Sequence, residues 1–149
     1  MLTIPIAVLN ATTEITNGEV AQAVAAVQIQ VHRDFAQVWK IDANLGFVPT
    51  GQKAPTDSWW VVVLDYSDLG GALGYHDLTS AGLPMGKVFA ATDKANGLSW
   101  TVTLSHEILE MLVDPNINRT AFQVTPNRQP VARLRSGGCL RSGPVRLLY

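Results

Sequence analysis

The chain contains a single cysteine and no long apolar run. Cys139, alone among 149 residues, excludes an internal disulfide and a cysteine-based zinc site. No uninterrupted apolar stretch is long enough to span a membrane, which takes about 20 residues. The N-terminal segment has no positive region and contains Pro5, so it does not resemble a signal peptide. We therefore expect a cytoplasmic protein without membrane association, with secretion by another route left open.

Charged residues are also scarce, at 15% of the chain, and they are unevenly distributed. All twelve acids fall within residues 1–114 beside five of the eleven basic residues, which gives that part a net charge of −7. Residues 115–149 contain six arginines and no acid, a net charge of +6. The overall charge of −1 argues against nucleic-acid binding by the whole molecule and confines that possibility to the basic C-terminal part.

Hydrophobic patterns predict an α+β domain. Apolar residues recur at three- and four-residue spacing from Val20 to Val38, as on one face of a long helix. The run WWVVVLDY is apolar and rich in β-branched residues, as in a central strand. Together the patterns predict strands at 3–9, 44–49 and 59–66, two short extended pieces within 72–90, and helices at 18–39 and about 98–113.

The composition changes near the C-terminus. From about Thr125 the sequence is rich in Arg, Gly, Pro and Ser and has little periodicity. We predict a folded domain at 1–120 and a weakly structured basic tail at 121–149. The tail is interpreted either as an electrostatic arm for an anionic partner or as the product of an altered reading frame, because out-of-frame GC-rich DNA encodes such a composition.

The stretch SHEILEMLVDP, residues 105–115, contains an unusual concentration of acids. One histidine and three carboxylates (His106, Glu107, Glu110 and Asp114) lie in a segment without lysine or arginine. On a helix His106, Glu110 and Asp114 share one side, with Glu107 beside them. A soluble helix normally offsets such charges with bases three or four positions away. The negative charges of this segment are therefore offset by solvent, by a distant side chain or by a metal ion.

HEILE resembles the HExxH active-site helix of zincin-type metallopeptidases, with Glu110 where the second histidine is expected. The expected order of a strand, a long backing helix, further strands and the active-site helix is also similar to that fold. The surrounding sequence, from LGYHDLTSAG to MLVDP, is similar to a group of bacterial and phage-associated proteins without an established activity. The resemblance implies a zincin-like α+β fold with a mixed twisted sheet and a peptide or protein substrate.

The same resemblance implies roles for individual residues. His106 and Glu110 correspond to metal ligands for zinc or another divalent cation, and Glu107 to the general base that takes a proton from the activated water. In the extended metzincin pattern the third ligand falls ten residues after the first, at Asn116, a poor zinc ligand. Asp114 is the better candidate, and His76 could contribute from the strand region. His76 and Tyr75 are candidates for substrate contact or for stabilising an oxyanion.

Two other interpretations remain open at this point. The chain could be a catalytically inactive zincin-like module, phage-associated and used for binding or structure. Alternatively, the carboxylates could face water, or pair with Arg119 or a tail arginine.

Overall fold

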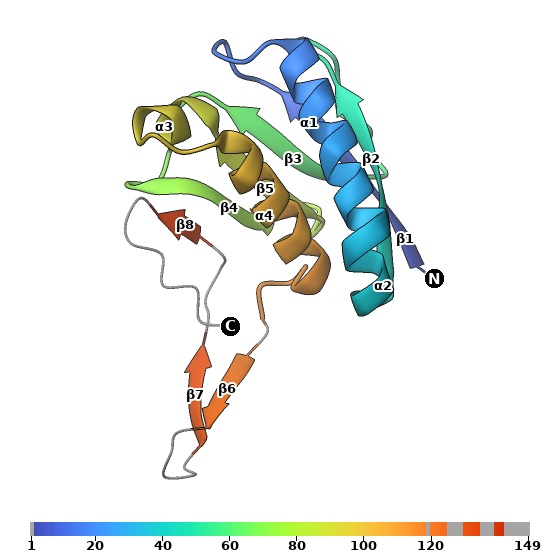
Figure 1. Ribbon diagram of the computed structural model, residues 1–149, viewed down its shortest axis with the longest axis vertical. Coiled ribbons are helices and arrows are strands. Elements are labelled where there is room, and N and C mark those ends of the chain that lie inside the picture. The colour runs from blue at the N-terminus through green and yellow to red at the C-terminus, as the bar shows by residue number, and fades with distance from the viewer. Residues whose placement is uncertain (1, 119, 125–129, 135–138, 142–149) are drawn as a thin grey trace.

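The computed structural model describes residues 2–118, 120–124, 130–134 and 139–141. It confirms an α+β fold in which the two long helical segments lie on the same face of a mixed sheet (Figure 1). The side chains of residues 2–118 are described, and beyond them only the backbone of three short strands. The predicted boundary at residue 120 and the weakly structured tail therefore stay predictions.

The sheet has six strands in the order β2-β1-β3-β5-β4-β8. Strands β1 (Leu2–Asn10), β2 (Ile41–Val48), β3 (Trp59–Leu64) and β5 (Pro84–Phe89) run parallel to one another. Strand β4 (Ala72–Leu78) pairs antiparallel with β5 on one side and with β8 (Cys139–Arg141) on the other. A separate hairpin is formed by β6 (Thr120–Val124) and β7 (Pro130–Leu134).

The long helix predicted at 18–39 exists as three joined helical segments. Helix α1 (Asn17–Gln30) begins at a capping box, in which the Thr16 hydroxyl accepts from the Glu19 N–H and the Glu19 carboxylate accepts from the Thr16 N–H. A π-helical turn, η1 (Val31–Phe35), continues it into α2 (Ala36–Trp39). The segment ends at Lys40, which adopts a left-handed conformation (φ 58°).

Two further helices follow β5. The short helix α3 (Ala90–Ala95), which the sequence patterns did not predict, begins directly after the strand. Helix α4 (Trp100–Val113) corresponds to the predicted helix at 98–113 and crosses β4 and β5. No helix among the described residues is both long enough and apolar enough to cross a membrane.

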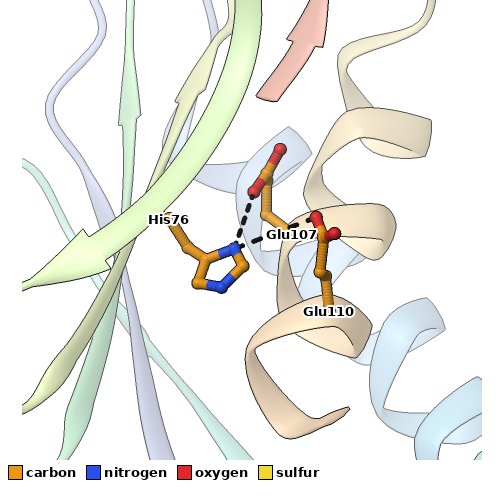
Figure 2. A group of neighbouring side chains, drawn as sticks. All are labelled: His76, Glu107 and Glu110. Carbon is orange, nitrogen blue, oxygen red and sulfur yellow. Dashed lines mark ion pairs between the residues drawn. The ribbon is translucent and has the colours of Figure 1, made fainter. Parts of the chain in front are cut away.

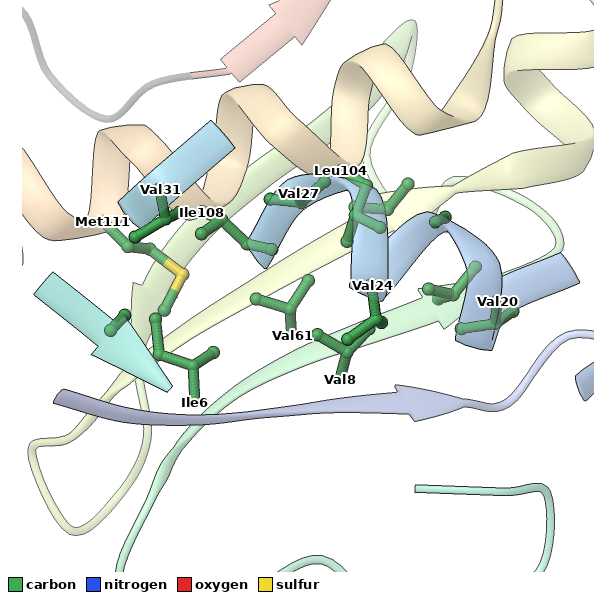
Figure 3. Packing of buried hydrophobic residues seen from close by; sticks show 14 of the residues in the cluster. Ile6, Val8, Val20, Val24, Val27, Val31, Val61, Leu104, Ile108 and Met111 are labelled. Carbon is green, nitrogen blue, oxygen red and sulfur yellow. The ribbon is translucent and has the colours of Figure 1, made fainter. Parts of the chain in front are cut away.

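The core lies between the sheet and the two long helical segments (Figure 3). Alternate residues of the central strands point toward the helices, as the pleat requires, and Val8 and Val61 are fully buried. Helix α1 contributes a valine stripe, and α4 contributes Leu104, Ile108 and Met111, each 0% exposed. The apolar side of α4 therefore fixes the helix on the sheet, and its neighbouring polar side faces β4.

Candidate metal centre

The polar residues of α4 meet β4 at one histidine. Gly74 and His76 are two positions apart on β4, so both point to the face that α4 covers, and both are buried. Glu107 and Glu110 come from the adjoining side of α4. Figure 2 shows the two carboxylates directed toward the His76 ring, each joined to it by an ion pair.

Three candidate ligand atoms converge at this point. His76 Nδ1 lies 3.8 Å from Glu107 Oε2 and 3.8 Å from Glu110 Oε2. Ligand atoms of the three residues all lie within 4.8 Å of one another. Separations of 3.8 Å are too long for hydrogen bonds, which join heavy atoms at about 3 Å. They leave space for an ion between the three groups.

A backbone carbonyl fixes the tautomer of His76. It thereby makes the nitrogen that faces the carboxylates a hydrogen-bond acceptor. His76 Nε2 lies 3.1 Å from the Asp114 carbonyl oxygen, and because a carbonyl only accepts, Nε2 donates. In the neutral ring the other nitrogen, Nδ1, then has a lone pair. A lone pair that faces two carboxylates is repelled by them unless a proton or a cation lies between. This is also the usual support of a metal-binding histidine, whose second nitrogen donates to a carbonyl or carboxylate.

Glu107 is enclosed completely. Its side chain is 0% exposed, and neither carboxylate oxygen has a hydrogen-bond partner among the described residues. Burial raises the pKa of Glu107 to about 7, against the opposing attraction of His76 and His106. An isolated buried carboxylate is costly, so this position favours either a bound proton or a cation.

The pKa of His76 shows the same electrostatics from the other side. Burial would lower it, but attraction to Glu107, the Asp114 carbonyl and the charge of Glu110 together raise it. A proton on Nδ1 is therefore the alternative to a cation at this point.

Described basic side chains do not supply the missing charge at Glu107. In residues 2–118, Lys87 pairs with Asp68 and Arg33 with Asp34, and only histidine forms an ion pair with Glu107. The side chains of Arg119 and of the tail arginines lie outside the described residues. The proposals that one of them pairs with this helix, or that the tail binds nucleic acid, stay predictions.

His106, the first ligand expected from the sequence, lies at the rim of the group. Its Nε2 is 3.1 Å from Glu110 Oε2, the same oxygen that faces His76, and its side chain is 36% exposed. Its contact with Glu110 raises the pKa of His106, although burial opposes the rise. His106 and Glu110 are thus neighbours, as their four-residue spacing predicts, with His106 as an outer fourth candidate.

The remaining predicted residues lie differently around the group. Asp114 ends α4, where its carboxylate accepts from the Asn118 N–H at 3.0 Å while its carbonyl oxygen orients His76. Tyr75 points to the opposite face of the sheet, as its place next to His76 requires, and its hydroxyl donates to Asp68.

From the sequence His76 was a candidate for substrate or oxyanion contact and for a contribution to the third ligand position, and the structure places it against both glutamates. A signal for this arrangement existed in the sequence. Gly74 and His76 alternate with outward-facing residues on one strand, and a strand brings such residues to one face. What the sequence did not contain was the registry of α4 against β4, which decides which carboxylates the ring meets.

The donor set fits a divalent cation. Zinc takes imidazole nitrogen and carboxylate oxygen at about 2.0–2.2 Å, usually in a tetrahedral arrangement. One nitrogen and two carboxylate oxygens make a harder, more anionic set than three histidines and are also acceptable to manganese or iron.

Comparison of the chain with known protein families, with curated protein sequences and with solved structures found no match. The structure therefore shows an α+β fold with a His76–Glu107–Glu110 group that could hold a metal ion.

Proposed function

We propose that the His76–Glu107–Glu110 group binds a divalent cation, zinc in the first instance, and that the protein uses it to hydrolyse a peptide bond in a peptide or protein substrate. The observation that supports this most is the convergence of His76 Nδ1 and two carboxylates at 3.8 Å in a buried place. The resemblance of HEILE to the zincin helix supports a zincin-like architecture as part of the same proposal.

Each residue has a defined task in this proposal. His76 and Glu110 hold the cation, and the Asp114 carbonyl holds the His76 ring in its ligating tautomer. A bound divalent cation lowers the pKa of a water toward neutrality and polarises a carbonyl group. Glu107, beside that cation, would accept the proton of the attacking water and pass it to the leaving amine.

Glu107 has a second possible task, as a third ligand. Its Oε2 lies as close to His76 Nδ1 as the Glu110 oxygen does. The variant Glu107→Gln distinguishes the two tasks. If Glu107 is the base, the variant keeps the cation and loses hydrolysis; if it is a ligand, the variant loses the cation as well.

A non-catalytic metal-binding module is the second candidate function. The complete burial of Glu107 favours it, because structural metal sites are closed whereas catalytic sites keep a position open for water. This module would bind the cation with the same residues and would not hydrolyse any peptide.

The first experiment is metal analysis of the purified protein, with thermal unfolding before and after chelation. We expect one divalent cation per chain and a lower melting temperature in chelator. At a free zinc concentration about 100 times Kd, binding stabilises the folded state by about 2.7 kcal/mol. Absence of stoichiometric metal, with the same melting temperature in EDTA and in zinc, contradicts the proposal.

The second experiment separates the two functions in the metal-loaded protein. Hydrolysis of a mixture of fluorogenic peptides is measured for the wild type and for Glu107→Gln, with the exposed Glu14→Gln as the matched control. Activity in the wild type and the control, but not in Glu107→Gln, supports the hydrolase. Bound metal without any cleavage supports the module.

A further inference from the structure

Gly74 lies against the Glu107 carboxylate. A Cβ atom added to Gly74 would be 2.7 Å from Glu107 Oε1 and 2.7 Å from Thr103 Cγ2. It would also be 2.9 Å from the Lys87 carbonyl oxygen. Real Cβ atoms do not approach other heavy atoms this closely. Gly74 does not have a positive φ, so it is the space and not the backbone conformation that requires glycine here.

The three neighbours of Gly74 cannot all yield to a larger side chain. The Lys87 carbonyl belongs to β5, which is hydrogen-bonded to β4 next to Gly74. Thr103 is 3% exposed and fixed in α4, and Glu107 is fully enclosed. An added methyl group therefore moves α4 away from β4 or rotates the Glu107 carboxylate.

Either movement changes the metal centre. Oε1 of Glu107 lies against Gly74, while Oε2 of the same carboxylate faces His76 Nδ1. Rotation of the carboxylate displaces Oε2 from His76. A shift of α4 away from β4 separates His76 from both Glu107 and Glu110, because both are on that helix.

We propose that Gly74 is a positioning residue of the metal centre, whose missing side chain sets the place of the Glu107 carboxylate relative to His76. The inference rests on the proposed metal binding, with Glu107 in its second task as the third ligand. Gly74 itself touches no cation or substrate. It acts through Glu107, and the space above its Cα determines where one of the two carboxylates can stand.

The chain provides a matched control on the neighbouring strand. Gly86 pairs with His76 across β4 and β5 and lies under the same helix. An added Cβ there would be 3.0 Å from Met111 Sδ and 3.4 Å from a Val61 methyl carbon, with no carboxylate among its nearest neighbours. Gly86→Ala therefore crowds the packing of α4 on the sheet without touching Glu107.

The test is titration of the full-length metal-free protein with Co²⁺, followed by visible absorption, which reports both affinity and coordination. We expect Gly74→Ala to weaken Co²⁺ binding by about 10- to 100-fold, the range for residues that orient ligands, and to change the absorption spectrum. Gly86→Ala should remain within about threefold of the wild type, with an unchanged spectrum, because the flexible Met111 side chain can yield to the new methyl group without a movement of α4.

A second variant separates positioning from packing. In Gly74→Ala combined with Thr103→Ser, the obstructing Thr103 methyl is removed and the contact with Glu107 remains. Its thermal stability in EDTA should recover toward the wild type while its Co²⁺ affinity stays low. Recovery of the affinity together with the stability overturns the inference, because packing alone would then explain the loss.

Two further outcomes are decisive. Wild-type Co²⁺ affinity and spectrum in Gly74→Ala, or an equal loss in Gly86→Ala, overturns the role of Gly74 and leaves the proposed metal binding standing. A wild-type protein that binds no Co²⁺ and no Zn²⁺ overturns the proposed function and this inference with it.

Discussion

All three histidines of this protein face carboxylates, and two of them, His32 and His76, do so as opposite tautomers. His32, on the π-helical turn, lies 2.6 Å from Asp42 through Nδ1, and its Nε2 lies 2.8 Å from the Gln28 side-chain nitrogen. Gln28 cannot be turned around, because its nitrogen donates to the Ala43 carbonyl and its oxygen accepts from the Leu45 N–H. The amide nitrogen therefore donates to His32 Nε2, and His32 Nδ1 donates to Asp42.

His76 has the reverse arrangement. Its Nε2 donates to the Asp114 carbonyl, so its neutral ring turns a lone pair, not a proton, toward Glu107 and Glu110. The two histidine side chains also differ in their exposure to solvent. The His32 side chain is 46% exposed and that of His76 only 1%. The His32–Asp42 pair is thus a complete hydrogen bond in contact with water. The group around His76 is buried and still requires a positive charge.

A short distance between a histidine and an acid does not by itself indicate a functional site. Exposed ion pairs contribute about 0–1 kcal/mol, because water already solvates both groups. Removing charges from water costs several kcal/mol per ion, so an incomplete buried group strongly favours whatever completes it. Three predictions test this difference, the largest effect first.

The largest effect is expected for metal affinity. Replacing His76 by alanine removes the nitrogen ligand of the group. Loss of a residue that only orients a ligand costs about 10- to 100-fold in metal affinity, so loss of the ligand itself should lower Zn²⁺ affinity by about 100-fold or more. His32→Ala is the matched control and should bind as the wild type does. Isothermal titration with Zn²⁺ measures both. Equal affinities in the two variants would show that the buried group is not the binding site.

A second buried carboxylate, Asp93 on α3, gives the next effect. It is 0% exposed, and burial raises its pKa to about 6 from 3.8, against a smaller opposing influence of Thr103. The folded state therefore holds the proton more tightly than the unfolded state does. The contribution of Asp93 to the free energy of unfolding falls as the pH rises from about 4 to about 6, and this loss is fully present above about pH 6.

Asp93→Asn should thus stabilise the protein above pH 6 by about 1–3 kcal/mol, with a gain that disappears below about pH 4. Urea unfolding of the metal-free protein from pH 4 to 8 measures the profile. The matched control, Asp57→Asn at an exposed position, should not show this gain. A difference between Asp93→Asn and the wild type that is constant across the pH range contradicts the assignment to the Asp93 carboxyl.

The smallest effect is expected at the exposed pair. Asp42→Asn removes the charge opposite His32 and should cost less than about 1 kcal/mol, because water replaces much of the interaction. The same urea experiment, repeated at high salt, should show the cost shrinking further. A loss of several kcal/mol here would mean that exposure does not distinguish the two histidines.

Much of the fold could be predicted from periodicity. The valines of α1 recur at helical spacing and form the core stripe, and the apolar run at 59–66 contains β3, the strand that adjoins β1 and β5. Helix α3 was missed, since Ala90–Ala95 is too short to show a period. The zincin-like architecture stays a prediction, because periodicity specifies elements and not their connection in space.

Within the candidate site, the sequence could predict only the contacts between residues that are close together along the chain. His106 and Glu110 meet because residues four apart on a helix are neighbours. Glu107 was expected as a base beside them, and its complete burial against Gly74 was not foreseen. His76 could be placed on a strand face, but no local rule connects residue 76 with residue 107.

The sequence by itself determined the long helices and the central strands, the shortage of positive charge in SHEILEMLVDP and the adjacency of His106 with Glu110, since each depends on residues close together along the chain. The tertiary structure alone decided that His76 meets Glu107 and Glu110 and which tautomer it presents. Those contacts depend on where α4 lies on β4, and the packing of Leu104, Ile108 and Met111 and the space above Gly74 set that position.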